Sequence, residues 1–286
     1  MTILIRALGN RTLHILVTAA AGTAFAVNVA PVFSAEPFDH DYKAYAAVLR
    51  AHVVDDRVNY LTLQENRTAL DAVVNDLGRV TASELVEWTR EQQIAYWVNA
   101  YNAFTLQVII EHYPITRRWF NFFSPASSIK QISGVWSTLR WRAGGNEMTL
   151  DDIEHGTLRQ HYDEPRIHFA VNCASISCPP LKPQPYIGEH LERQLILAAR
   201  DFLASDLGVK VETNTLHVSS MLNWFGDDFI EQYSRLVDTT GSAKTRALLG
   251  VIAKYGPRDA ARVAKSGNAR IRFLRYDWSL NDTAAR

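Results

Sequence analysis

Two cysteines, Cys173 and Cys178, are the side chains of this chain with the greatest chemical potential, and both lie in the segment 166–180. A cysteine can act as a nucleophile when its thiolate is stabilised, and it can also bind a metal or form a disulfide. Cys173 follows an apolar run and precedes small residues, where a nucleophile could be exposed. The prolines at 179–180 hold Cys178 in extended chain. We therefore predict that Cys173 is the nucleophile of a thiol-dependent enzyme.

A thiol nucleophile needs a base, and two histidines lie near Cys173 in the sequence. We expect His155 to be the general base, with His168 as the alternative. If 166–172 is a strand, His168 points away from residue 173, so a Cys173–His168 pair requires the chain to bend at residue 172 or 173. The ordinary interpretation of His168 is a half-buried side chain that bonds to backbone.

Polar side chains on an otherwise apolar segment could complete this site. Asn99 and Asn102 are three residues apart and are therefore neighbours on a helix. They would either orient the base and stabilise an oxyanion or brace a loop, since buried amides need hydrogen-bond partners. The candidate substrate-binding residues are Tyr101, Arg159, Arg166 and Asn172.

The alternative is a non-catalytic periplasmic binding or accessory module, in which Cys173 and Cys178 form a structural disulfide. An exchangeable redox pair fits less well, because four residues separate the cysteines and thioredoxin-like motifs have two. A zinc site is not expected, since a second pair of ligands at the usual spacing is missing. The sequence indicates no cofactor, and it has no phosphate-binding loop or serine-hydrolase motif.

The N-terminus is typical of a secretory signal. Arginines at 6 and 11 precede an apolar stretch from 13 to about 26, and the first acidic residue is Glu36. We predict a signal peptide over 1–35 with cleavage between 26 and 35, although the stretch could remain as an uncleaved anchor. Cleavage leaves 28 basic and 30 acidic residues, a balance with no footprint for nucleic acid or for an anionic membrane. We expect an exported protein, periplasmic or extracellular, without stable membrane insertion, that binds a small-molecule or peptide-like ligand.

The periodicity of apolar residues predicts one α+β domain over 36–286. The segment 91–113 is apolar nearly all round and should form a central buried helix, packed on a small, mostly antiparallel sheet. Two hairpins are expected, one around 144–146 and one around 213–214. The other expected helices are 41–53, 68–77, 82–89, 149–159, 188–203, 220–232 and 243–255, and the other expected strands or extended segments are 58–63, 166–172 and 271–278.

Five blocks, at 96–105, 152–159, 165–173, 177–180 and 276–281, together resemble the family catalogued as domain of unknown function 547 (DUF547). The resemblance spans roughly residues 40–281. It implies no established activity.

The family's pattern includes Asn99, Tyr101, Asn102, His155, Arg159, His168, Cys173 and the 177–179 step, all present here. Plant relatives have a serine where Cys178 stands, which implies that the disulfide is not a family-wide requirement. A distant similarity to papain-like or transglutaminase-like thiol enzymes is a fold-level analogy. Such an analogy does not establish an activity, and it is the residues above that favour a cysteine-dependent hydrolase or acyltransferase acting on an amide or peptide-like substrate.

Overall fold

Helix α5 (Arg90–His112) runs through the centre of the fold, and nearly every residue from Ile94 to Ile110 is buried. Thr89 caps it in a reciprocal arrangement: the Thr89 side chain accepts the Gln92 N–H, and the Gln92 side chain accepts the Thr89 N–H. The helix stops just before Pro114. The predicted central helix is thereby confirmed. The computed structural model describes residues 37–119 and 121–285, so the predicted signal peptide lies outside the described residues.

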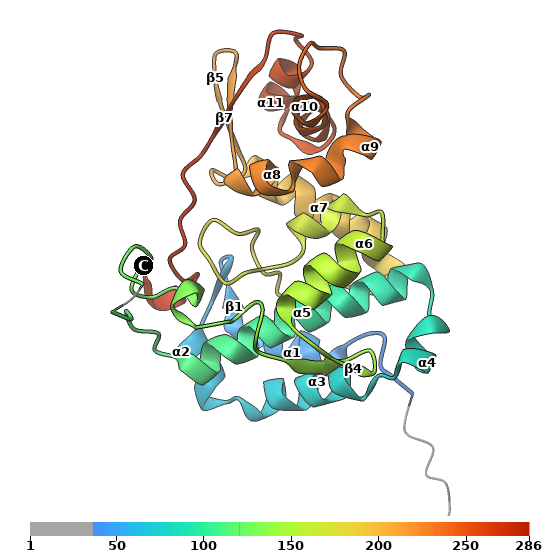
Figure 1. Ribbon diagram of the computed structural model, residues 1–286, viewed down its shortest axis with the longest axis vertical. Coiled ribbons are helices and arrows are strands. Elements are labelled where there is room, and N and C mark those ends of the chain that lie inside the picture. The colour runs from blue at the N-terminus through green and yellow to red at the C-terminus, as the bar shows by residue number, and fades with distance from the viewer. Residues whose placement is uncertain (1–36, 120, 286) are drawn as a thin grey trace, which may run out of the picture. The chain divides into compact units, whose positions relative to one another are not determined.

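Around α5 lie α3 (Thr68–Arg79), α2 (Tyr60–Glu65) and a small hairpin, as Figure 1 shows. The hairpin pairs β3 (Trp141–Ala143) with β4 (Asn146–Met148). Its Trp141 ring stacks on Phe104 of α5 with ring centroids 5.4 Å apart. Gly144 turns this hairpin with φ 56°, and a Cβ atom there would lie 2.7 Å from the Trp97 ring. Only glycine fits this turn without displacing α5.

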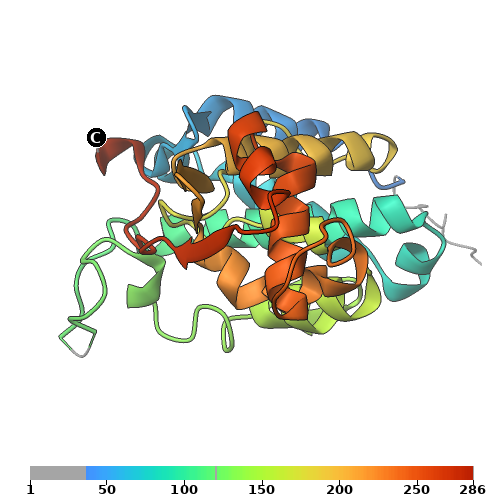
Figure 2. The same ribbon diagram turned by 90° about the horizontal axis from the view of Figure 1, so that it is seen from above.

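A second apolar core lies apart from the core of α5. It gathers α7 (Leu191–Ala204), α10 (Ala243–Tyr255) and α11 (Arg258–Ala264) against the longest sheet. Figure 1 shows α10 and α11 at one end of the fold, α5 nearer the other end and α7 between them, and Figure 2 gives the view from above. The segment just before Cys173 passes between the two cores and contributes side chains to both.

The sheets are small and mostly antiparallel, which confirms the α+β class. Strand β1 (Val53–Val54) pairs with β2 (Arg57–Val58), and β5 (Val209–Glu212) pairs with β6 (Thr215–Val218), both antiparallel. Strand β7 (Arg270–Phe273) adds to β6 in parallel.

The remaining elements are α1 (Lys43–His52), α4 (Ala82–Val86), η1 (Ile129–Gln131), the π-helix η2 (Asp152–Leu158), α6 (Arg159–His161), η3 (Pro165–Phe169), η4 (Gly188–His190), α8 (Ser220–Phe225), η5 (Gly226–Phe229), α9 (Ile230–Tyr233) and η6 (Thr283–Ala285). Within the described ranges, no helix combines the length and apolar composition that a membrane crossing requires.

The predicted strand at 166–172 is wrong. Pro165 opens the 3₁₀ helix η3 instead, and the Glu164 carboxylate caps it by accepting the Arg166 N–H. The chain then continues without regular structure to Cys173, because the side chain of Asn102 bonds to the backbone that a neighbouring strand would have paired.

Three other segments also differ from the prediction. The segment expected to be extended at 58–63 is helical from Tyr60, because Asn59 caps α2 through its side chain. The expected helix 220–232 is divided into α8, η5 and α9. The final strand ends at Phe273 rather than at residue 278.

Candidate functional site

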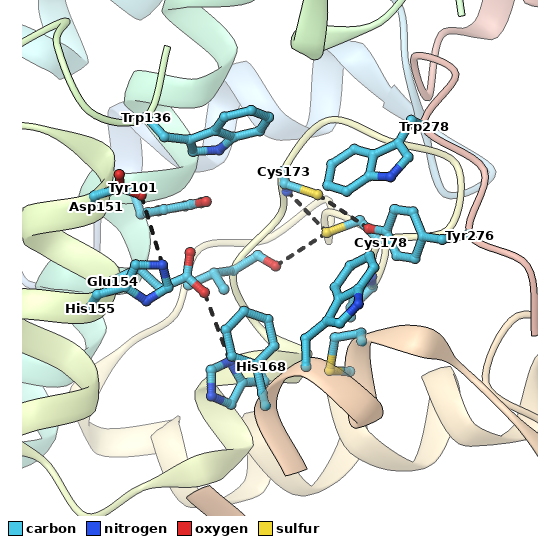
Figure 3. A pocket seen from close by; sticks show the side chains of 15 residues that line it. Tyr101, Trp136, Asp151, Glu154, His155, His168, Cys173, Cys178, Tyr276 and Trp278 are labelled. Atoms are coloured by element: carbon cyan, nitrogen blue, oxygen red, sulfur yellow. Dashed lines mark hydrogen bonds and ion pairs between the residues drawn. The ribbon is translucent and has the colours of Figure 1, made fainter. Parts of the chain in front are cut away.

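A pocket opens where η2, the cysteine segment, α8 and the C-terminal tail meet (Figure 3). One part of its lining carries ionisable or reactive groups: Asp151, Glu154, His155, His168, Cys173 and Cys178. The larger part is aromatic or apolar: Tyr101, Trp136, Val171, Pro179, Met221, Trp224, Phe225, Tyr276 and Trp278. An apolar pocket with a few convergent polar groups is the usual form of a small-molecule site.

Two buried asparagines shape the backbone that presents Cys173 to this pocket. Asn102 Oδ1 accepts the Asn172 N–H at 2.8 Å, and its Nδ2 donates to the Ala170 carbonyl at 3.0 Å. Asn172 in turn accepts the Ala174 N–H at 2.9 Å and donates to the Pro179 carbonyl at 2.7 Å. Ala174 has φ 57°, a conformation that costs a residue with a Cβ about 1–2 kcal/mol. These bonds hold the chain in a bend after residue 172. A bend at this point is what a Cys173 on the same side as His168 was expected to need.

Cys173 is the thiol that this environment activates. Cys178 donates a hydrogen bond to its thiolate form, and Ser175 Oγ and Tyr276 OH lie 3.2 and 3.3 Å from Sγ. Together these bonds lower the pKa of Cys173 to about 7, although burial and the Glu154 charge both raise it. Burial raises the pKa of Cys178 well above its ordinary value. Cys173 is also the partly exposed thiol of the two, whereas Cys178 is buried.

Both cysteines are free thiols in the structure. They are nevertheless close neighbours, since the Cys173 N–H donates to Cys178 Sγ at 3.0 Å. A Cys173–Cys178 disulfide therefore stays a prediction for oxidising conditions. Among the described residues, no group of three or more histidine, cysteine or acidic side chains is arranged to hold a metal ion.

A buried acid and a buried histidine face each other across the pocket wall. Glu154 is 7% exposed, and its burial raises the pKa of its carboxyl, although a hydrogen bond with Tyr101 lowers it in part. His168 Nδ1 lies 3.9 Å from Glu154 Oε1, and the ring stacks on Phe225 with centroids 4.0 Å apart. The gap is too long for a direct hydrogen bond, and His168 Nδ1 has no hydrogen-bond partner among the described residues.

The hydrogen bond of Nε2, the other ring nitrogen of His168, determines which of the two nitrogens carries the proton. His168 Nε2 lies 2.7 Å from Asp228 Oδ2, and burial lowers the pKa of the imidazole, so the neutral ring donates its proton to Asp228. Nδ1 then carries the lone pair toward Glu154, an assignment that follows from the hydrogen-bond pattern. Burial alone would raise the pKa of Asp228, but hydrogen bonds from Arg159 and His168 hold it well below its usual value. The result is a fixed carboxylate behind a neutral, proton-accepting imidazole.

Helix η2 explains how Glu154 reaches the pocket beside His155. It is a π-helix, whose wider turn is frequently found at functional sites. His155 is the more exposed of the two: its Nε2 lies 3.8 Å from Asp151 Oδ1, and its Nδ1 lies 3.2 Å from an Arg159 nitrogen. Both η2 residues line the pocket with Cys173.

The pocket brings together five of the residues that the sequence singled out: Tyr101, His155, His168, Cys173 and Cys178. The expected hydrogen bond between Cys173 and a histidine is not formed, because the side-chain groups that bond to Sγ are Ser175, Tyr276 and Cys178. A relay to either imidazole must therefore pass through another group.

The expected oxyanion or base-orienting role of Asn99 and Asn102 has no geometric support. Asn99 bonds through both ends of its amide to the backbone of Tyr186, at 2.7 and 2.9 Å, and neither asparagine lines the pocket. They brace loops, as does Asn172. The contacts therefore favour the second role considered for Asn99 and Asn102, which is to brace a loop.

The two predicted substrate-binding arginines are held in ion pairs outside the lining of the pocket. Arg159 makes a two-pronged ion pair with Asp228, at 2.6 and 2.8 Å. Arg166 is buried in ion pairs with Glu164 and Glu192, at 2.5 and 2.6 Å. Neither lines the pocket, so their contacts support a positioning role.

Sequence reasoning missed Asp228 and Tyr276 and left Glu154 without a role. The block that contains Tyr276 was visible as part of the resemblance, but nothing local indicated that its hydroxyl would contact Cys173. Asp228 lies 60 residues from His168, in a segment expected to be an ordinary helix.

Comparison with known families confirms the expected resemblance over part of the chain. Residues 85–203 match the family described as "Protein of unknown function, DUF547". This segment contains α5, η2 and both cysteines. Two parts of the site lie outside it: the C-terminal tail, which lines the pocket, and Asp228, which bonds to His168. No curated protein and no solved structure matches the chain significantly, and the papain-like analogy stays a prediction.

Proposed function

We propose that this protein is a thiol-dependent hydrolase or acyltransferase that acts on an amide or peptide-like substrate, with Cys173 as its nucleophile. One observation carries the proposal: a thiol whose pKa is lowered to about 7 and a buried Glu154–His168 pair face the same pocket. Reactive groups with pKa values shifted toward neutrality are characteristic of catalytic sites. The predicted signal peptide would place this activity in the periplasm or outside the cell.

The proton of Cys173 would pass to the Glu154–His168 pair. The charge of Glu154 raises the pKa of Cys173, and both side chains line the same pocket. The raised pKa of Glu154 brings it toward the lowered pKa of Cys173, which makes the transfer less costly than between ordinary groups. Asp228 holds the imidazole of His168 in the form that accepts a proton at Nδ1.

The reaction would then follow the usual course of covalent acyl transfer. Cys173 Sγ attacks the carbonyl carbon, and a C–S bond forms while the electron pair of the C=O bond moves to oxygen. The C–N bond breaks as the tetrahedral intermediate collapses, and the leaving nitrogen takes the proton held by the Glu154–His168 pair. Water or an acceptor amine then attacks the thioester, gives a proton back to the pair, and releases the Cys173 thiolate.

The aromatic walls suit such a substrate. Trp224 stacks near Trp278 with ring centroids 5.7 Å apart, and Trp136 approaches Trp278 edge-on at 6.1 Å. These rings surround the thiol with apolar surface, which excludes water and strengthens the electrostatic effect of each polar group. An acyl group with an apolar portion would be held against them.

The test begins with mature protein purified from its exported compartment without reductant. Titration of thiols before and after denaturation should find two free thiols, and peptide mapping should find that Cys173 alkylates fast near neutral pH. Cys173→Ala should then abolish turnover of acyl and peptide probes while the unfolding midpoint stays unchanged. Cys178→Ala is the matched control, because it removes a neighbouring thiol but keeps the nucleophile, and it should retain measurable turnover.

Two outcomes would contradict the proposal. Finding no free thiol after denaturation, with no activity restored by reductant, would favour the binding module with a structural disulfide. Turnover that survives Cys173→Ala would place the chemistry elsewhere. A comparison of Glu154→Gln with His155→Ala separates the buried pair from the base expected from sequence, since the proposal requires the larger loss from Glu154→Gln.

A further inference from the structure

A second hollow lies on the other side of the wall formed by Tyr276 and Trp278. Both residues line the reactive pocket and this hollow, and Tyr276 OH is 3.3 Å from Cys173 Sγ. The loop between α5 and η1 supplies the opposite wall through Phe122 and Phe123. The tail is bonded to this loop, because the Leu280 N–H donates to the Ser127 carbonyl at 2.9 Å. Tyr276 and Trp278 therefore form the wall that the hollow shares with the pocket of Cys173.

The hollow is lined by cationic side chains. Arg117 and Arg275 both line it, and Lys130 Nζ lies 4.7 Å from the centroid of the Trp278 ring, another of its lining side chains. Asp277 is the acidic residue of the lining, and one of its oxygens already accepts the Ser279 N–H. This excess of positive charge contrasts with the whole chain, in which 30 basic and 30 acidic residues balance.

The two arginines differ in how they are held. Arg117 donates to the Phe122 carbonyl at 3.2 Å, which anchors one nitrogen and leaves its other donors available. Arg275 makes no ion pair with any residue that the structure describes, and it is exposed. Guanidinium groups bind carboxylate and phosphate oxygens in pairs of hydrogen bonds. The apolar rings between them and the thiol would contact an uncharged linker.

We propose that the substrate carries an anionic group, a carboxylate or a phosphate, which binds between Arg117 and Arg275 while the acyl carbon lies at Cys173. This subsite rests on the proposed function, since it assigns the substrate class of the same pocket. The anion and the acyl carbon would be separated by a linker that passes Tyr276 and Trp278. Substrates without the charge would react at the same thiol but bind less well.

The test uses alkylating probes, so that it does not depend on finding the substrate. Bromoacetyl-aminohexanoate carries a carboxylate, and bromoacetamidohexyl phosphate carries a phosphate. The neutral match is the N-methylamide of bromoacetyl-aminohexanoic acid. For each probe, the rate of Cys173 alkylation is measured by peptide mapping. This rate is divided by the rate at which the same probe alkylates glutathione. The anionic probes should react faster than the neutral one, and the better of the two identifies the anion.

Charge variants then locate the effect. Arg117→Gln and Arg275→Gln should each lower the ratio of anionic to neutral rates by roughly two- to fivefold, and the double variant by about tenfold, as expected for partly exposed ion pairs. Added salt should reduce the ratio in the native protein. Arg272→Gln is the matched control, because Arg272 is an exposed arginine just before the tail that does not line the hollow. Iodoacetate and iodoacetamide are too short to span the wall, and their ratio should not respond to either variant.

The outcomes separate the two proposals. If Cys173 does not react with the neutral probe, the proposed nucleophile itself is refuted. If Cys173 reacts but the ratio stays the same in all variants, the nucleophile stands and the anionic subsite is refuted. Two results would indicate a general electrostatic field rather than a subsite. One is that Arg272→Gln lowers the anionic-to-neutral ratio as much as Arg275→Gln does, and the other is that Arg275→Gln lowers the iodoacetate-to-iodoacetamide ratio to the same extent.

Discussion

The hydroxyl of Tyr276 should be one of the groups that make Cys173 reactive, and Tyr276→Phe removes it without removing the ring. The hydroxyl lies 3.3 Å from Cys173 Sγ and 2.9 Å from Ser175 Oγ, so it can donate to the thiolate. Hydrogen bonds to charged groups contribute about 1.5–3 kcal/mol, and sulfur is a weak acceptor, which favours the lower end. Since about 1.4 kcal/mol corresponds to one pKa unit, we expect the pKa of Cys173 to rise by about one unit.

This shift has a measurable consequence. With a pKa of about 7, roughly half of Cys173 is thiolate at neutral pH. After a rise of about one unit, roughly one tenth remains, so alkylation by iodoacetamide at neutral pH should slow about fivefold. The assay is the rate of Cys173 alkylation against pH, followed by peptide mapping. At high pH, where both proteins are fully ionised, the two rates should converge.

Tyr113→Phe is the matched control. Its hydroxyl bonds to Asp282 at 2.7 Å and does not line the pocket, so the Cys173 profile should be unchanged. A Tyr276→Phe profile with an unaltered midpoint would refute the argument that this hydroxyl stabilises the thiolate. A lower rate at every pH would instead indicate a changed shape of the pocket.

Three further variants test the groups around the thiol. Glu154→Gln should flatten the pH dependence of stability: because the folded pKa of Glu154 is raised, native stability falls as pH rises from about 4.5 through that folded value, and urea unfolding of the variant should lose this decline. Asp228→Asn should lower the pKa of His168 further and cost roughly 1–3 kcal/mol, as measured by NMR titration and by urea unfolding; an unchanged imidazole titration would refute the contact. Asn102→Ala should cost about 2–4 kcal/mol, because it leaves two buried backbone groups near Cys173 without partners, and a loss below about 1 kcal/mol would mean that the loop is held otherwise.

Local sequence signals predicted the elements whose stability is local. Helix α5 was readable because its apolar surface runs all round and Pro114 follows its end, and α10 matches its predicted range of 243–255. The two predicted hairpins form where glycine or a residue such as Thr213, with φ 53°, permits the turn. These features depend on neighbours within a few residues, which a single sequence contains.

The segment 166–172 shows why the site was harder to predict. Its apolar residues alternate, which indicates a strand. In the structure, Ile167 and Val171 belong to the core around α5, whereas Phe169 belongs to the core around α7 and α10. The alternation therefore reflects a chain that passes between two cores. Periodicity reports which residues are buried, but not which core buries them.

The contacts that define the chemistry are also long-range. His168 meets Asp228 and Cys173 meets Tyr276 across separations of 60 and 103 residues. Each pairing depends on how the second core docks beside the first, since Asp228 and Tyr276 are attached to elements of that core. Residue types could nominate Cys173 and His168, but only the fold could identify their partners.

Glu154 and Cys173 line the same pocket, and this placement bears on how each of them ionises. Both groups are withdrawn from water, and the charge of Glu154 opposes the charge of Cys173. Two negative charges in one pocket repel each other, so a negative charge on Glu154 makes ionisation of Cys173 more costly. In the proposed mechanism, a proton on the Glu154–His168 pair and a thiolate at Cys173 form the state from which attack on an acyl carbon would begin.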